Sequence, residues 1–194
     1  EYGYDVATDP SGNVYLSGYT SSATGIASGG FQNTFGGDID AFIVKFDASG
    51  NRLWASYYGD IGVEIGWSVA TDLTGNVYLA GQTSSNSAIS SMGFQNTLGG
   101  ISDGFLVKFD QLGNRLWATY YGGAGTNYGY CVATDVSGDV YLAGTTSSTS
   151  SIASGGHQNT YGGGGFDAYL VKFSGSGTRI WATYYGGSSF EHGY

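Results

Sequence analysis

Residues that build disulfides, metal sites and cationic surfaces are scarce in this 194-residue sequence. The single cysteine, Cys131, excludes a disulfide within the chain and argues against a zinc site. Only two histidines, His157 and His192, are present as potential general bases. Six cationic and 15 acidic side chains give a formal net charge of −9. This balance argues against a nucleic-acid partner, because phosphate binding needs a basic surface.

Long apolar runs and proline are also scarce. No apolar stretch approaches the ~18 residues that can cross a bilayer, so we expect no membrane insertion, and no signal peptide is recognised. The chain has one proline but 36 glycines, with 17 Tyr, 10 Phe and 4 Trp. Aromatic runs punctuated by glycine favour an all-β protein with many tight turns.

The sequence repeats itself with a period of 63 residues. "EYGYDVATD" at residue 1 returns as "EIGWSVATD" at 64 and "NYGYCVATD" at 127, and "EHGY" starts at 191, after a longer glycine run. We therefore divide the chain into repeats 1–63, 64–126 and 127–190, with 191–194 as the start of a fourth repeat or a closure segment. The chain begins and ends at the same point of the repeat. We expect a piece of a longer array or one protomer of a ring.

Each repeat contains four short strand-like runs joined in pairs by tight turns. In the first repeat these are residues 5–9, 13–20, 40–47 and 51–59, and Gly12 and Gly50 occupy turn positions that need a positive φ. Bulky side chains on both faces of "FIVKF" indicate a sheet covered on both sides. The sequence therefore predicts an all-β fold of three four-stranded antiparallel repeats arranged as β-propeller-type blades. A parallel β-helix fits less well, because its coils are shorter.

Three blades are too few to close a propeller, which typically has four to eight. The two outer blades would then expose apolar faces. We expect either two chains that together form a ring or a longer chain that supplies the remaining blades.

The stretch "GDIDAFIVKFDASGNRLWASYYG" followed by "EIGWSVATDLTGNVYLAGQTSS" resembles the SBBP β-propeller repeat of bacterial proteins. The resemblance covers the whole chain three times. It implies bladed β-propeller architecture in secreted or cell-surface proteins, with no particular enzyme activity or cofactor. The loop "SATGIASGGFQNT" departs from the family, because it lacks the proline often found there.

The cationic residues occupy only two positions of the repeat, and one tryptophan recurs beside them. Charges locked to the repeat usually brace a scaffold, for instance between neighbouring units. We predict that these residues are structural and lie between blades: Trp54, Trp117, Trp181, Lys45, Lys108, Lys172, Arg52, Arg115 and Arg179.

Catalysis has little support in the sequence. His157 replaces the Phe31 and Phe94 of the other repeats, which favours an aromatic packing role, and no G-x-S-x-G elbow occurs. We predict no catalytic residues and no enzyme activity. No cofactor is expected, with calcium as the alternative, since Asp38 and Asp40 in "GGDID" offer hard oxygen ligands.

A long loop in each repeat ends in "FQNT", "FQNT" or "HQNT". Its amides could bind the hydroxyl groups of glycans, or they could hydrogen-bond the backbone of their own loop, which we favour because the motif is the same in every repeat. The candidate glycan-binding residues are Gln32, Asn33, Gln95, Asn96, Gln158 and Asn159.

The sequence thus favours a non-enzymatic structural or adhesive module of a bacterial secreted or cell-surface protein. Its expected partners are other copies of itself, forming a ring or a fibrous array, or further repeats of the same chain. A carbohydrate-binding propeller with one loop site per blade is the alternative from a different functional class.

Overall fold

The computed structural model describes residues 1–194, which form twelve β-strands. It contains no helix that could span a membrane. The strands are β1 (Tyr2–Thr8), β2 (Val14–Thr20), β3 (Asp40–Phe46), β4 (Arg52–Tyr58), β5 (Glu64–Thr71), β6 (Val77–Thr83), β7 (Asp103–Phe109), β8 (Arg115–Tyr121), β9 (Asn127–Thr134), β10 (Val140–Thr146), β11 (Asp167–Phe173) and β12 (Arg179–Tyr185).

Each sheet is an antiparallel meander of four strands that follow one another in the chain: β1–β4, β5–β8 and β9–β12. The structure therefore confirms the predicted all-β fold of three four-stranded antiparallel repeats, as propeller-type blades require. The turn glycines Gly12 and Gly50 both have a φ of 82°, which confirms the left-handed conformation expected of them.

The first strand is longer than the sequence pattern indicated. β1 starts at Tyr2, which pairs with Tyr19, and its register shifts between Gly3 and Asp5. This β-bulge breaks the alternation of side chains, so a pattern of period two loses the strand there. The equivalent strands β5 and β9 carry the same irregularity.

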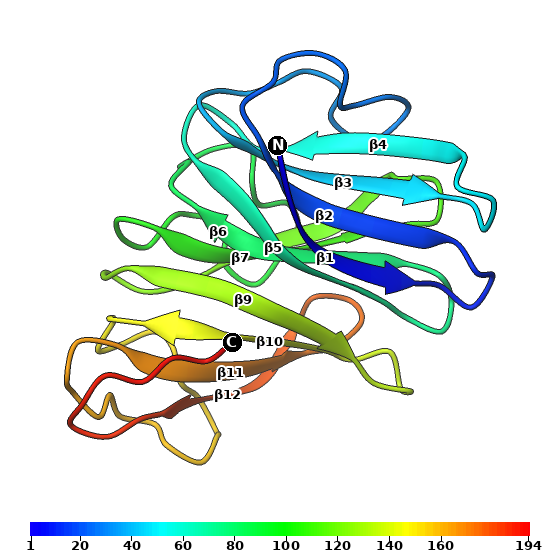
Figure 1. Ribbon diagram of the computed structural model, residues 1–194. Helices are drawn as coiled ribbons and strands as arrows, with labels where there is room; N and C mark the ends of the chain where they lie inside the picture. Colours follow the sequence, from blue (N-terminus) through cyan, green and yellow to red (C-terminus); the bar gives the residue numbers. More distant parts are fainter.

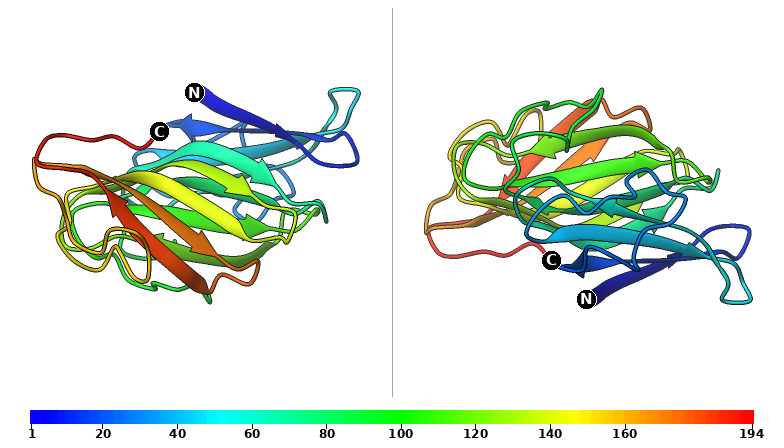
Figure 2. Two further views of the ribbon diagram at one scale, coloured as in Figure 1. Left: turned by 90° about the horizontal axis from the view of Figure 1, so that it is seen from below. Right: turned by 90° about the horizontal axis from the view of Figure 1, so that it is seen from above.

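The three sheets lie one after another as layers, with the first and third at opposite ends (Figure 2). Their first strands, β1, β5 and β9, lie side by side along one edge of the stack (Figure 1). Hydrogen bonds between residues 63 positions apart join these strands. Thr71 Oγ1 donates to Thr8 O, and Thr134 Oγ1 donates to Thr71 O, both at 2.7 Å. We call the contact of the first and second sheets the first seam, and that of the second and third sheets the second seam.

Candidate functional site: the seams between blades

The recurring tryptophan lies at each seam. Trp54 is 4% exposed and its Nε1 donates to Gln111 O in the next repeat at 3.1 Å. Trp117, also 4% exposed, donates to Gly175 O at 3.0 Å. Each indole also packs on a phenylalanine of the following blade, with ring centroids 6.4 Å apart for Trp54 and Phe109. The recurring tryptophan thus contributes to the core between sheets, as the sequence predicts.

The repeated lysine has two sets of partners. Lys45 Nζ lies 3.6 Å from Asp9 Oδ2 within its own sheet, and it donates across the seam to Gln111 O at 3.2 Å. Lys108 repeats both contacts, with Asp72 at 3.3 Å and with Gly175 O at 3.1 Å. The ion pair itself therefore braces one blade, whereas the ammonium group also contacts the backbone of the next blade.

The repeated arginine contacts the preceding blade. The guanidinium carbon of Arg115 lies 4.3 Å from the ring centre of Phe31, and Arg179 lies 4.3 Å from that of Phe94. Such stacking holds the "FQNT" loop of one repeat against the last strand of the next. In the third repeat the stacked phenylalanine is replaced by His157, which no arginine of this chain covers.

The two outer sheets each present one half of a seam. The third sheet exposes the side that would meet a following blade: Tyr185 is 69% exposed, whereas the equivalent Tyr58 and Tyr121 are 1% and 0% exposed. Trp181 is partly exposed there, and Lys172 pairs only with Asp135 and Asp139. We call this the outgoing face.

The first sheet exposes the side that would meet a preceding blade, which we call the incoming face. Phe42, Val44 and Ala55 form a separate small cluster there, with the partly exposed Leu16, Ile26 and Phe46 packed against it. The equivalents of Phe46 in the other repeats, Phe109 and Phe173, are fully buried in the seams. Arg52 is exposed on this face.

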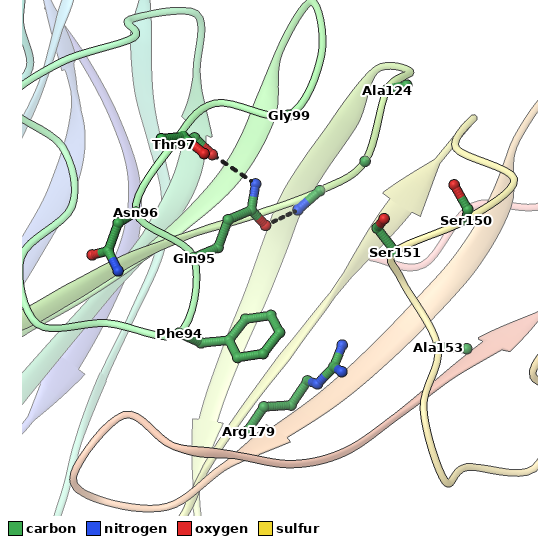
Figure 3. A pocket seen from close by; sticks show the side chains of 12 residues that line it. Phe94, Gln95, Asn96, Thr97, Gly99, Ala124, Ser150, Ser151, Ala153 and Arg179 are labelled. Atoms are coloured by element: carbon green, nitrogen blue, oxygen red, sulfur yellow. Dashed lines mark hydrogen bonds between the residues drawn. The ribbon is translucent and has the colours of Figure 1, made fainter.

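A pocket opens at each seam, beside the "FQNT" loop. The larger, of about 660 Å³, is bounded by Phe94, Asn96, Ser151 and the Arg179 of the next blade (Figure 3). The smaller, of about 510 Å³, has Phe31, Asn33, Ala88 and Arg115 in the equivalent places. A third hollow of about 320 Å³ lies on the outgoing face, between His157 and Trp181.

The glutamine side chains of the candidate glycan site bind their own loop. Gln95 Nε2 donates to Thr97 O at 2.9 Å, while its Oε1 accepts from Gly122 N at 3.0 Å (Figure 3). Gln95 Nε2 also donates to Asp103 Oδ2 at 2.8 Å. Gln32 makes the equivalent bonds, and Gln158 donates to Thr160 O and Gly186 O. Both amide hydrogens of each glutamine are therefore in use.

The asparagine side chains leave more capacity for a ligand. The amides of Asn33, Asn96 and Asn159 each donate once, to Gly30 O, Gly93 O and Gly156 O, from exposed positions. Asn33 and Asn96 line the two seam pockets. Gln32 and Gln95 line the same pockets, so a ligand there would find a free amide hydrogen on the asparagine rather than on the glutamine.

The candidate calcium ligands occupy different environments. Asp38 is exposed, whereas Asp40 is 0% exposed and receives hydrogen bonds from Gly36 N and Gln32 Nε2 on its Oδ2 atom. Burial, together with the charges of Glu64 and Asp60, raises the pKa of Asp40 to about 6, although hydrogen bonds from the Gly36 and Gly37 backbone oppose the rise. No group of three or more His, Cys, Asp and Glu side chains is gathered for a metal ion.

The histidines are not part of a polar cluster. His157 is exposed beside Trp181, and the ring of His192 lies between those of Phe190 and Tyr194, with centroid distances of 4.6 and 5.3 Å. Neither histidine has a hydrogen-bonded nucleophile beside it of the kind that covalent catalysis requires.

Comparison with known proteins gives one family and two long relatives. The family model SBBP, described as a β-propeller repeat, matches residues 2–25, which confirms the repeat identified in the sequence. An uncharacterised WD repeat-containing protein of Acanthamoeba polyphaga mimivirus is 30% identical over 153 residues, covering 72% of this chain and 11% of that protein. The regulatory protein FlaEY of Caulobacter vibrioides is 26% identical over 172 residues, covering 88% and 18%. The chain thus spans less than a fifth of either relative.

Proposed function

We propose that this chain, which carries SBBP β-propeller repeats, is a non-enzymatic structural module that associates through its open blade faces. The observation that carries the proposal is that one interface occurs twice within the chain, while the two outer sheets each present one half of it. The incoming face offers Leu16 and Phe46, and the outgoing face offers Trp181 and Tyr185. These residues are the counterparts of those buried in the seams.

A structural role also accounts for the polar residues. Arginine, lysine and glutamine side chains that recur in the repeat donate hydrogen bonds to backbone of the same or the next blade. Side chains used in this way position loops and sheets, and they are not available for proton transfer. An adhesive role in a secreted or cell-surface bacterial protein is part of the proposal, and its support is the SBBP resemblance.

The mass of the wild-type chain in solution tests the association. Light scattering coupled to size exclusion should give a mass above 20.1 kDa that rises with concentration. A matched control is Leu73→Arg, because Leu73 is 68% exposed in the turn between β5 and β6, away from both open faces. The control should associate as the wild type does. A wild-type chain that stays monomeric up to high concentration would refute self-association.

Glycan binding is the second candidate, and the recurrence of the pocket at both seams favours it. A glycan array with the wild type and the double variant Asn33→Ala, Asn96→Ala is the test. Retained structure is expected, because each asparagine makes one exposed hydrogen bond. Loss of signal in the variant would support glycan binding, and a wild type that binds no glycan would remove it.

A further inference from the structure

A pair of buried carboxylates lies where the first repeat passes into the second. Asp40, at the start of β3, and Glu64, at the start of β5, are both 0% exposed. Both converge on Gly59: a Cβ on this glycine would lie 2.6 Å from Asp40 Oδ1 and 2.7 Å from Glu64 Oε2. Two negative charges thus meet where water is excluded, which is unfavourable without a compensating group.

One of these oxygens has no partner. Asp40 Oδ1 is buried and makes no hydrogen bond, although Oδ2 of the same carboxylate makes two. Glu64 offers it no donor, because its own oxygens accept from Thr83 Oγ1 and Asp60 N. A buried, unpartnered carboxylate oxygen normally indicates a missing cation, proton or water.

The second repeat shows what fills the same place. Asn127 stands where Glu64 stands one repeat earlier, and its Nδ2 lies within 3.4 Å of four oxygens: Asp103 Oδ1 and the carbonyls of Ser102, Gly123 and Gly125. Here every carboxylate oxygen of Asp103 has a partner. A single positively polarised nitrogen therefore sits in an oxygen cage at this junction.

The frame of the cage is the same at both junctions. Asn127 N donates to Ser102 O and Glu64 N to Ile39 O, each at 2.8 Å. The threonine partner is also equivalent, since Thr146 donates to Asn127 and Thr83 to Glu64, each at 2.6 Å. Replacing the amide by a carboxylate therefore leaves oxygens only: Asp40 Oδ1 and Glu64 Oε2. The carbonyls of Ile39, Asp60 and Gly62 hold the repeat positions of the three that surround the Asn127 amide.

The carboxylate pair returns after the third repeat. Asp167 Oδ1 is again buried without a partner, and Glu191 stands at the position of Glu64 and Asn127. A Cβ on Gly186 would lie 2.7 Å from Asp167 Oδ1 and 2.8 Å from Glu191 Oε2. Glu191 N donates to Phe166 O at 2.9 Å, as in the other two cages.

We propose that the Asp40–Glu64 and Asp167–Glu191 cages each bind a calcium ion, and that the Asn127 amide takes the place of that ion in the middle junction. Hard oxygens of two carboxylates and several carbonyls, with waters to complete six to eight ligands, suit calcium. Its double charge balances the two carboxylates. The first site ties the first blade to the second, and the other ties the third blade to the segment 191–194 that follows it. The proposal does not depend on self-association or on glycan binding.

Calorimetric titration of calcium into the chelator-treated wild type is the direct test. The expected result is two calcium ions per chain and a higher melting temperature with calcium than in chelator, because a ligand that binds only the folded state stabilises it. Magnesium should bind at least about tenfold more weakly, since it requires near-ideal octahedral geometry.

Variants assign the site. Glu64→Gln offers an amide like that of Asn127, so it should reduce the stoichiometry to one and raise the melting temperature of the calcium-free protein. Asp38→Asn is the matched control, because it removes the same charge from an exposed position two residues from Asp40. It should keep both ions.

Two results would overturn the proposal. One is a wild type that binds no calcium, including the case in which it is merely stabilised below pH 6 because the carboxylates share a proton. The other is a Glu64→Gln variant that binds as many ions as the wild type.

Discussion

The tryptophan that recurs in each repeat lies in one of two different environments. Trp54 and Trp117 are buried in seams, whereas Trp181 lies on the outgoing face and is partly exposed. Because the local sequences around these tryptophans are nearly the same, the three positions separate the contribution of the seam from that of the blade. The comparison is possible only because the repeat keeps the residue while the position in the stack changes.

We predict that Trp117→Ala lowers the free energy of unfolding by about 3–5 kcal/mol, the usual cost of a large buried aromatic, because it also leaves Gly175 O without its indole donor. Trp181→Ala should cost less than about 1 kcal/mol, since its neighbours are partly solvated. Urea unfolding measures the loss of free energy in each variant. Both are made in a Tyr185→Arg background, which prevents another copy from covering the outgoing face. Equal losses would contradict the assignment of the tryptophan to the seam.

The aspartates of the hairpin turns account for the loss of folding stability at low pH. Burial alone would raise the pKa of Asp72, but hydrogen bonds from Thr74 and Asn76 and the charge of Lys108 outweigh it and bring the pKa to about 2. The unfolded value is about 3.9. Because the folded pKa is the lower one, the stabilisation is present above about pH 4 and is lost as the pH falls through about 2.

Asp72→Asn should therefore remove up to about 2.5 kcal/mol of the stability that the wild type loses between pH 4 and pH 2. Urea unfolding at intervals of pH measures the difference. We expect the two curves to converge at low pH. If the free energies of unfolding of the variant and the wild type fell in parallel between pH 4 and pH 2, another group would control the loss of stability at low pH.

Some residue roles could be read from the sequence and others could not. Trp54 could be assigned to a seam because it recurs in every repeat beside a turn glycine. A residue that serves one ligand site has no need to recur in this way. The stacking of Arg115 on Phe31 could not be read, because the two residues are 84 positions apart and belong to different repeats. The pairing of Glu64 with Asp40 could not be read either, because the position of Glu64 holds Asn127 in the third repeat and the repeat pattern therefore shows no shared ligand there.

At the scale of the element, the hairpin turns combine a local and a seam requirement. Gly50 and Gly113 occupy equivalent turns with φ values of 82° and 84°. A Cβ on Gly50 would meet nothing within 4 Å, whereas one on Gly113 would lie 2.9 Å from the indole of Trp54. Glycine is thus required at position 50 only by the turn conformation. At position 113 it is required both by the turn conformation and by the indole of Trp54.

Gly50→Ala should cost about 1–2 kcal/mol, the strain of an alanine in the left-handed region. Gly113→Ala should cost more than this, because the methyl group displaces Trp54 from the seam. Thermal unfolding of both variants tests the difference. The seam contribution would be absent if the two variants melted at the same temperature.

The sheets were predictable because each strand and each turn carries its own local signal. The alternating runs and the turn glycines gave four strands per repeat, and the structure places them close to the expected ranges. The start of β1 was not predictable in this way, since the bulge near Asp5 reverses the alternation. A pattern of period two contains no information about such an irregularity.

At the scale of the whole molecule, two unlike faces are left open. The incoming face carries the partly exposed Leu16 and Phe46, and the outgoing face carries Trp181 and Tyr185. Each kind of face meets the other kind at the two seams inside the chain, so contacts between copies should be head to tail. Contacts of this type close a ring or continue as an array, and blocking one face of each copy stops either outcome.

Complementation of two face-blocked variants tests the central claim, that every open face is one half of a seam. Tyr185→Arg blocks the outgoing face and Phe46→Asp the incoming face, so each variant alone should sediment as a monomer of about 20.1 kDa. An equimolar mixture keeps one intact pair of faces and should sediment as a one-to-one dimer that grows no further. A mixture that stays monomeric, or a single variant that still associates, would contradict the account.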